Sequence, residues 1–207
     1  MVPAYNEAEN IGTVLAILKK CPRIDEIIVV DDGSADKTSQ VAAKYGVTVI
    51  KQKNQGKGVA MKTGVKATDA PYIFFADADI LGFNNEHLEA LARPVIEKNA
   101  MMTVGLRDRG SFLVWLLPKI APVLGGERVM PRELFLSLSG PATRDFGIET
   151  VMNAYCAKKH LAVEYVSLKG VTQVIKEKKY GWWRGFRARV RMVGQILRAE
   201  WGVMRMK

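Results

Sequence analysis

Pairs of acidic residues that directly follow apolar segments are the feature of this sequence best suited to chemistry. Asp77-Ala78-Asp79 comes straight after the apolar run of residues 72–76. In an extended segment, residues two apart face the same way, so both carboxylates could reach one cation. Hard oxygen ligands with no imidazole or thiolate nearby suit Mg²⁺ or Mn²⁺, which would bridge to phosphate oxygens. We therefore predict a metal role for Asp77 and Asp79, against the alternative of a common tripeptide without function.

A second acidic pair follows an earlier apolar run. Asp31 and Asp32 come after residues 27–30, and Gly33 and Ser34 follow them. A tight turn at Gly33, with Ser34 capping the next helix, would explain this segment. Such a turn needs only one acid. The other carboxylate could accept hydrogen bonds from a nucleobase imide or a ribose hydroxyl.

Two further segments could contact the same ligand. Residues 3–7 read Pro-Ala-Tyr-Asn-Glu, and the ring of Tyr5 could stack on a base. The alternative is an ordinary strand-to-helix turn capped by Asn6. Residues 55–58 read Gln-Gly-Lys-Gly and precede a helical pattern, where an anion could sit at the amino end of the helix. That segment matches neither the P-loop nor the dinucleotide fingerprint, so alone it does not identify a phosphate site.

The elements that must position these groups are short strands alternating with helices. Apolar runs at residues 27–30, 47–50, 72–76 and 101–105 alternate with helical patterns at 7–20, 35–45, 57–67 and 86–98. This pattern predicts an α/β fold with a mostly parallel sheet covered by helices on both faces. Ligands of such sheets bind beyond the carboxyl ends of the strands, where the acids stand.

The remaining segments complete one domain. Residues 132–138 and 148–158 have helical patterns, and residues 163–167 resemble another strand. Only Met1 and Val2 precede Pro3, which is short for a buried strand, so we expect the sequence to begin late in its first strand.

Composition narrows the class of protein. Hydrophobic residues make up 48% and charged residues 25% of the 207, which fits a globular domain. Two cysteines and two histidines exclude a disulfide-rich scaffold and a Cys/His zinc cluster. The longest apolar run, near residues 112–117, is too short to span a membrane, and Glu7 and Glu9 argue against a secretory signal. These features favour a cytoplasmic location.

The positive charge is concentrated at the carboxyl end. Residues 176–207 hold ten Lys/Arg and two acids, while the whole chain has a net charge of +10. Within Trp182–Met204, apolar residues recur every three or four positions and arginines fall opposite them. This pattern predicts a basic amphipathic helix on an anionic membrane surface. The alternative is a terminal helix packed on the sheet. No motif supports nucleic-acid binding, so we expect no nucleic-acid partner.

The motifs together resemble the family 2 glycosyltransferases, which have a Rossmann-like nucleotide-diphospho-sugar transferase fold. The similar segments, in the order of that family, are residues 2–7, 30–38, 54–58 and 77–80. The second half is similar to the dolichyl- and polyprenyl-phosphate sugar (mannose or glucose) synthases, at residues 105–107, 125–128, 132–133, 146–149 and 176–181.

The resemblance implies roles for individual residues. The implied nucleotide-sugar-binding residues are Pro3, Ala4, Tyr5, Glu7, Asp31, Asp32, Lys57, Asp77, Ala78, Arg107 and Lys179. The implied metal ligands are Asp77 and Asp79, for Mg²⁺ or Mn²⁺. The implied catalytic residues are Asp79, Arg107, Arg128 and Glu149, and the implied acceptor-phosphate contacts are Arg128, Arg132 and Lys179. Gln173 departs from the pattern, because these synthases often have a basic residue there.

The resemblance also implies an activity. It is metal-dependent transfer of a hexose from a UDP- or GDP-sugar to a polyprenyl or dolichyl phosphate, with inversion, by a peripheral protein on the inner face of the membrane. Residues 1–107 would bind the nucleotide sugar, 108–181 would form the acceptor side, and 182–207 the basic helix. A phosphate acceptor is already ionised and needs no general base, whereas a hydroxyl acceptor would need one, with Glu149 or Asp145 as candidates.

Three other functions compete with this one. A soluble family 2 glycosyltransferase would act on a hydroxyl acceptor, such as a polysaccharide or a small glycoside, and would work without lipid. A nucleotidyltransferase of related fold would carry a glycine- and arginine-rich signature where this chain has residues 5–7. A non-catalytic membrane adaptor would leave the acids at successive strand ends unexplained.

Overall fold

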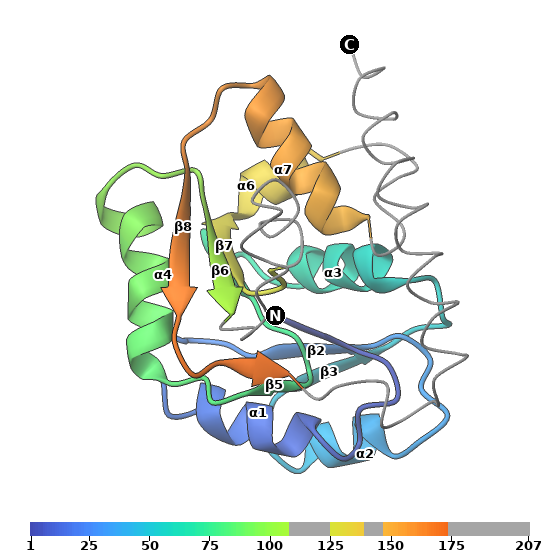
Figure 1. Cartoon of the computed structure of the whole chain (residues 1–207). Helices are drawn as coiled ribbons and strands as arrows, with labels where there is room; N and C mark the ends of the chain where they lie inside the picture. Colours follow the sequence, from blue (N-terminus) through green and yellow to red (C-terminus); the bar gives the residue numbers. More distant parts are fainter. Residues whose placement is uncertain (108–124, 139–146, 174–207) are drawn as a thin grey trace, which may run out of the picture.

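The computed structural model describes residues 1–107, 125–138 and 147–173, which form an α/β fold (Figure 1). Its first sheet is parallel throughout, in the order β1 (Val2–Ala4), β2 (Ile28–Asp31), β3 (Thr48–Lys51). All four residues of β2 are buried, as expected for the central strand of a sheet covered on both faces.

The second sheet has the order β4 (Tyr72–Phe75), β7 (Arg128–Pro131), β6 (Met102–Arg107), β8 (Val163–Leu168). Strand β7 runs antiparallel to both of its neighbours, while β6 and β8 are parallel. The backbone of Met1 joins the two sheets, because its nitrogen donates to the Phe74 carbonyl (2.8 Å) and its carbonyl accepts from the Ala76 N–H (3.1 Å). The carboxyl ends of β1, β2 and β4 therefore lie along one edge.

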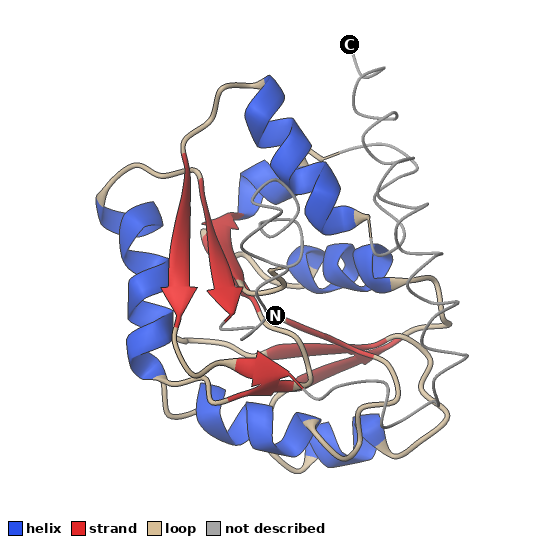
Figure 2. Cartoon of the chain, in the orientation of Figure 1, coloured by secondary structure: helices blue, strands red, loops and turns tan. Residues whose placement is uncertain are grey.

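Helices cover both faces, as Figure 2 shows. One core is formed with α1 (Ile11–Leu18), α2 (Thr38–Ala43) and α4 (Asn85–Glu97), and the other with α3 (Lys57–Lys66), α6 (Arg132–Leu136) and α7 (Ile148–Lys158). Alternate strand residues face opposite cores: Val129 of β7 packs in the first and Met130 in the second. The predicted α/β fold, with helices on both faces of the sheet, is confirmed.

A third sheet consists of two short strands. Strand β5 (Ile80–Leu81) pairs antiparallel with β9 (Thr172–Gln173). His87 stabilises the turn before β9, since its Nε2 lies 3.1 Å from the Lys169 carbonyl while its Nδ1 accepts from the Asn84 N–H in a capping box. This arrangement places residue 173 beside residue 80.

The four predicted apolar runs form β2, β3, β4 and β6, each within two residues of its expected limits. Strand β7 was not expected, because Arg128 and Pro131 interrupt its apolar pattern, and it adds an antiparallel strand to the second sheet. The expected helix 182–207 lies outside the described residues. Within the part of the chain that is described, no helix has the length and apolarity needed to cross a bilayer.

Candidate active site

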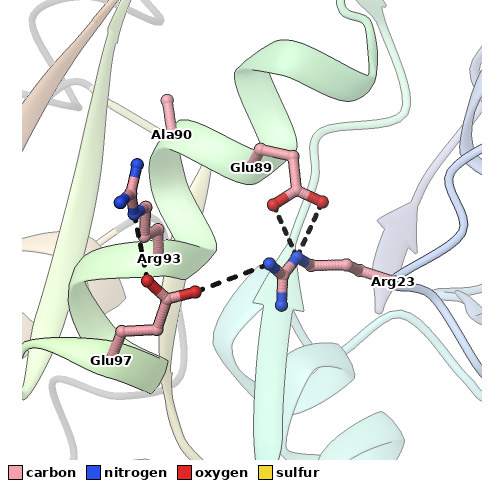
Figure 3. A pocket seen from close by; sticks show the side chains of 5 residues that line it. All are labelled: Arg23, Glu89, Ala90, Arg93 and Glu97. Carbon is pink, nitrogen blue, oxygen red and sulfur yellow. Dashed lines mark hydrogen bonds and ion pairs between the residues drawn. The ribbon is translucent and has the colours of Figure 1, made fainter.

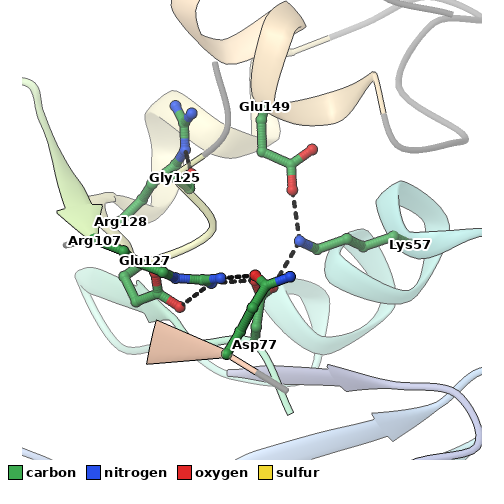
Figure 4. A network of polar contacts seen from close by, with 8 residues as sticks. Lys57, Asp77, Arg107, Gly125, Glu127, Arg128 and Glu149 are labelled. Carbon is green, nitrogen blue, oxygen red and sulfur yellow. Dashed lines mark hydrogen bonds and ion pairs between the residues drawn. The ribbon is translucent and has the colours of Figure 1, made fainter. Parts of the chain in front are cut away.

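The carboxylate of Asp77, just beyond β4, is bound by two cations. Its Oδ1 lies 2.7 Å from the Lys57 ammonium, and its Oδ2 accepts from Nη2 of Arg107 (Figure 4). Lys57 is the first residue of α3, following Gly56 at a φ of 95°, a backbone conformation that favours glycine. Arg107 is the last residue of β6. The sheet and the glycine turn thus direct three predicted site residues toward one point.

Lys57 also contacts the second half of the chain. Its Nζ lies 2.5 Å from Oε1 of Glu149, in the first turn of α7, so one ammonium bridges two carboxylates (Figure 4). Burial alone would lower the pKa of Lys57, but the charges of Asp77 and Glu149 outweigh it and raise that pKa above its ordinary value. Lys57 is therefore held as a cation.

Arg107 is also bound by two further residues. Its Nε and Nη2 donate to Oε2 (2.6 Å) and Oε1 (2.5 Å) of Glu127, and its Nη1 donates to the side-chain oxygen of Gln173. Burial alone would raise the pKa of Asp77, yet Lys57 and Arg107 hold it well below its ordinary value. Glu127 and Gln173 were not predicted as site residues. Glu127 lies inside the matched segment 125–128, and that position was the only signal available.

This network predicts how stability depends on pH. Since the pKa of Asp77 lies below its ordinary value of 3.8 in the folded chain, the carboxylate contributes stability that is complete above that value and is lost as pH falls toward the folded-state pKa. We expect the difference in free energy of unfolding between the wild type and Asp77→Asn to be largest at pH 7 and to shrink below about pH 4. Urea titrations from pH 7 to pH 2.5 would measure it, and a difference that stays constant would contradict the ion pairing.

Gly126 makes room for the Asp77 carboxylate. A Cβ atom at position 126 would overlap the carboxyl group of Asp77. We therefore expect Gly126→Ala to displace Asp77 from Lys57 and Arg107 and to lower the turnover of an enzyme that uses this site about 100-fold, the typical cost of misplacing a reacting group by an ångström. Gly12→Ala in α1 is the control, because its Cβ would meet only the tip of Tyr45. Equal rates for the two variants would contradict this role of Gly126.

Asp31 and Asp32 lie at the carboxyl end of β2 and organise the loops around it. Both are 4% exposed. Asp31 accepts from the Ser34 N–H (2.9 Å) and from the Ser39 hydroxyl. Asp32 accepts from the Gln52 side chain (2.7 Å) and from the backbone N–H groups of residues 55 (2.9 Å) and 56 (2.8 Å). Asp32 therefore fixes the loop that delivers Lys57.

Residues 3–7 lie beside this pair. Pro3 and Ala4 belong to β1, and the Ala4 carbonyl accepts from the Asp32 N–H at 2.9 Å. Tyr5 is 48% exposed at the strand end. The Glu7 N–H donates to the Thr38 hydroxyl (2.9 Å), and its carboxylate accepts from the Asn10 side chain (2.7 Å). The structure thus gathers the predicted nucleoside contacts at the same edge as Asp77, Ala78 and Asp79.

Two of the predicted phosphate contacts lie apart from the Asp77 network. Arg128 is fully buried and points away from Asp77 (Figure 4). Its Nε donates to the Gly125 carbonyl (2.9 Å) and its Nη1 to Asn153 of α7 (2.6 Å). Arg132 donates to the Thr68 carbonyl (2.7 Å), beyond the carboxyl end of α3, about 15 Å along the helix from Lys57. Lys179 and Asp145 lie outside the described residues.

Carboxylates are the groups of this site that could bind a divalent cation. Asp77 is paired with Lys57 and Arg107, and Asp79 lies two residues beyond it. No cluster of three or more His, Cys, Asp or Glu side chains able to hold a metal occurs among the described residues. Mg²⁺ commonly uses only one or two carboxylates, with phosphate oxygens completing its shell. The Asp77–Asp79 pair therefore fits a metal that binds together with a diphosphate.

A separate hollow lies between α4 and the segment that follows α1 (Figure 3). Its charged side chains pair with one another: Arg23 contacts Glu89 (2.5 Å) and Glu97 (3.6 Å), and Arg93 contacts Glu97 (3.0 Å). Exposed pairs of this kind contribute about 0–1 kcal/mol each. We interpret the hollow as a surface ion-pair cluster that fastens residue 23 to α4.

Parts of the chain are similar in sequence to curated proteins. The chain is 41% identical over 75 residues to a dolichyl-phosphate hexose transferase of Haloferax volcanii (36% of this chain, 33% of that protein). It is 28% identical over 185 residues to a glucosyl-3-phosphoglycerate synthase of Petrotoga mobilis (71% of this chain, 56% of that protein). The chain thus spans between a third and little more than half of the length of these relatives.

The fold is shared with a solved glycosyltransferase. The crystal structure of glucosyl-3-phosphoglycerate synthase from Mycobacterium tuberculosis, in complex with Mn²⁺, UDP and glucosyl-3-phosphoglycerate, superimposes with a TM-score of 0.78. The match covers 96% of this chain and 77% of that one at 22% identity. The family model of glycosyl transferase family 2 matches residues 1–138, two thirds of the sequence. The chain therefore belongs to glycosyl transferase family 2.

Proposed function

We propose that this chain transfers a hexose from a UDP- or GDP-sugar to a polyprenyl or dolichyl phosphate, with inversion, in a metal-dependent reaction. The observation that carries the proposal is the convergence of Asp77, Lys57 and Arg107 at the carboxyl edge of the sheet. Such an edge is where nucleotides bind in open α/β sheets. The dolichyl-phosphate hexose transferase of Haloferax volcanii supports the choice of acceptor.

The donor would lie along this edge. Asp77 and Asp79 would hold Mg²⁺ or Mn²⁺, which when bound supplies positive charge to the leaving diphosphate. Lys57 and Arg107 would add two fixed positive charges on the same side, a form of electrostatic stabilisation. The exposed ring of Tyr5 would stack on the base, with Glu7, Asp31 and Asp32 holding the loops around the nucleoside.

The acceptor distinguishes two versions of this function. A lipid phosphate is already ionised and needs no base, which fits the engagement of Glu149 by the Lys57 ammonium at 2.5 Å. Transfer to a hydroxyl, as the name of the Petrotoga mobilis relative implies, would require a base such as Glu149 to be released from Lys57. In that version, Glu149→Gln would reduce turnover about 100-fold or more.

The carboxyl-terminal segment supports the lipid version. In the sequence of Trp182–Met204, apolar residues recur every three or four positions with arginines between them, and a helix with this pattern would suit peripheral contact with the anionic inner face of a membrane. We expect the chain to sediment with anionic vesicles and to remain in solution with neutral ones. Equal sedimentation with both would contradict electrostatic membrane contact.

The experiment measures sugar transfer from radiolabelled UDP- and GDP-hexoses with Mg²⁺ or Mn²⁺. One arm contains polyprenyl phosphate in liposomes, a second contains 3-phosphoglycerate, and a third contains neither. Label in the lipid phase that disappears on chelation supports the lipid version. Label on 3-phosphoglycerate replaces it with the hydroxyl version. Metal-independent transfer, or no binding of either nucleotide, contradicts the proposal.

A further inference from the structure

Glu127 is a buried acid to which the proposed function gives no task. It lies just before β7 and is 0% exposed. Its two oxygens grip one edge of the Arg107 guanidinium, at 2.6 Å from Nε and 2.5 Å from Nη2. Paired parallel bonds of this kind fix both the distance and the plane of a guanidinium. Burial, reinforced by the nearby charge of Asp77, raises the pKa of Glu127.

A buried ion pair is weak evidence for stability, because removing the charges from water offsets much of their attraction. The contacts of Glu127 indicate instead that it holds the Arg107 guanidinium in a defined position. Its carbonyl accepts from the Gly105 N–H at 2.8 Å, and a Cβ at Gly105 would lie 3.1 Å from the Glu127 Cβ. A side chain at position 105 would therefore press on both Leu168 and Glu127, so the glycine allows the two segments to approach closely.

The other contacts of Arg107 face the proposed donor site. Its Nη2 reaches Asp77 and its Nη1 reaches Gln173 (Figure 4 shows the first of these). Together with the bonds to Glu127, four of the five guanidinium N–H groups are used. One Nη1 hydrogen has no partner among the residues that the structure describes. The guanidinium is thus anchored along one edge and has one donor left on the other.

We propose that Glu127 is a positioning residue that acts through Arg107. Glu127 holds the guanidinium in a fixed plane. In that orientation Arg107 keeps Asp77 in place and directs its remaining N–H donor toward the phosphate groups that react. Lysine at position 107 could not do the same, because an ammonium does not bind a carboxylate in the planar two-bond manner. This inference rests on the proposed function, since the phosphates are those of that reaction.

A double-mutant cycle on Glu127→Gln and Arg107→Lys tests this role. Two quantities are measured for the wild type and the three variants: the affinity for UDP or GDP with Mn²⁺ by calorimetry, and kcat/KM for transfer. We expect Glu127→Gln to lower kcat/KM by about 10–100-fold, as for residues that orient a ligand from behind. The double variant should be no worse than Arg107→Lys alone, because the two residues act as one unit.

Independent losses that multiply in the double variant would overturn the proposal, and so would full activity of Glu127→Gln. Glu164→Gln on β8 is the control, because its side chain is exposed and touches none of these groups. If Glu127→Gln is unfolded at the assay temperature, the cycle is repeated with Glu127→Asp, which keeps the charge and shortens the reach by one methylene group. Nucleotide binding can be measured without any acceptor. If the wild type binds UDP but transfers no sugar, the proposed acceptor is wrong, and the double-mutant cycle can still be completed on nucleotide affinity alone.

Discussion

Replacing Asp79 by alanine should abolish metal-dependent sugar transfer, with a loss of about 10³-fold, equivalent to about 4 kcal/mol of transition-state stabilisation. Asp79 lies two residues beyond Asp77 and is 7% exposed. Asp79→Ala tests metal binding more cleanly than Asp77→Ala. Replacing Asp77 would also remove the ion-pair partner of Lys57 and Arg107, so a loss of activity could come from lost metal binding or from disturbed structure. Calorimetry should show that Mn²⁺ no longer strengthens nucleotide binding.

The control for this experiment is Asp69→Ala. Asp69 precedes strand β4, whereas Asp79 follows the other end of that strand. The Asp69 side chain is fully exposed and lies 3.8 Å from Arg132. We expect its kcat/KM and its metal dependence to match those of the wild type. If Asp79→Ala retains full activity while Asp69→Ala behaves as expected, the metal assignment is wrong.

Lys57→Met should have the second largest effect, because one ammonium contacts two carboxylates that are mostly shielded from solvent. The side chains of Lys57, Asp77 and Glu149 are 17%, 21% and 11% exposed. Removing one partner of such a pair leaves uncompensated buried charge and costs about 3 kcal/mol. We expect a loss of that size in the free energy of unfolding, measured in urea, and about a 100-fold loss of kcat/KM below the melting temperature.

Lys62→Met is the matched control. Lys62 is exposed on the same helix, and methionine has a similar helix propensity to lysine. We expect less than 0.5 kcal/mol of change in its free energy of unfolding, as is usual for surface substitutions. Equal stability and activity of the two variants would show that the bridge between α3 and α7 contributes to neither property.

Much of the fold could be predicted from the sequence because its buried strands are continuous apolar runs. Residues 28–31 and 72–75 are strands where the pattern places them, and the helix at Ile148–Lys158 has the predicted limits. Strands β5 and β9 are two residues long, too short for any periodicity to register. Strand β7 contains a buried arginine, and its place in the sheet depends on partners far along the chain.

The site was predictable where one short segment carries the whole signal. Asp77 and Lys57 belong to local motifs, and the structure brings them within 2.7 Å. The role of Gln173 depends on the pairing of β9 with β5, a tertiary contact that no local pattern encodes. Likewise, the burial of Arg128 follows from packing against α7, so its charge alone did not reveal its surroundings.

The central position of β7 sets the order in which this molecule can be built. Phe75 of β4 pairs with Arg128, and Thr103 of β6 pairs with Val129. During synthesis from the amino end, β4 and β6 must therefore wait for residues 128–131 before they can share a sheet. Closing such non-local pairs is slow. Because Glu127 directly precedes β7, its bonds to Arg107 can form when β7 joins the sheet. Glu149 and Gln173, which contact Lys57 and Arg107, lie later in the chain and are added only after β7 has been synthesised.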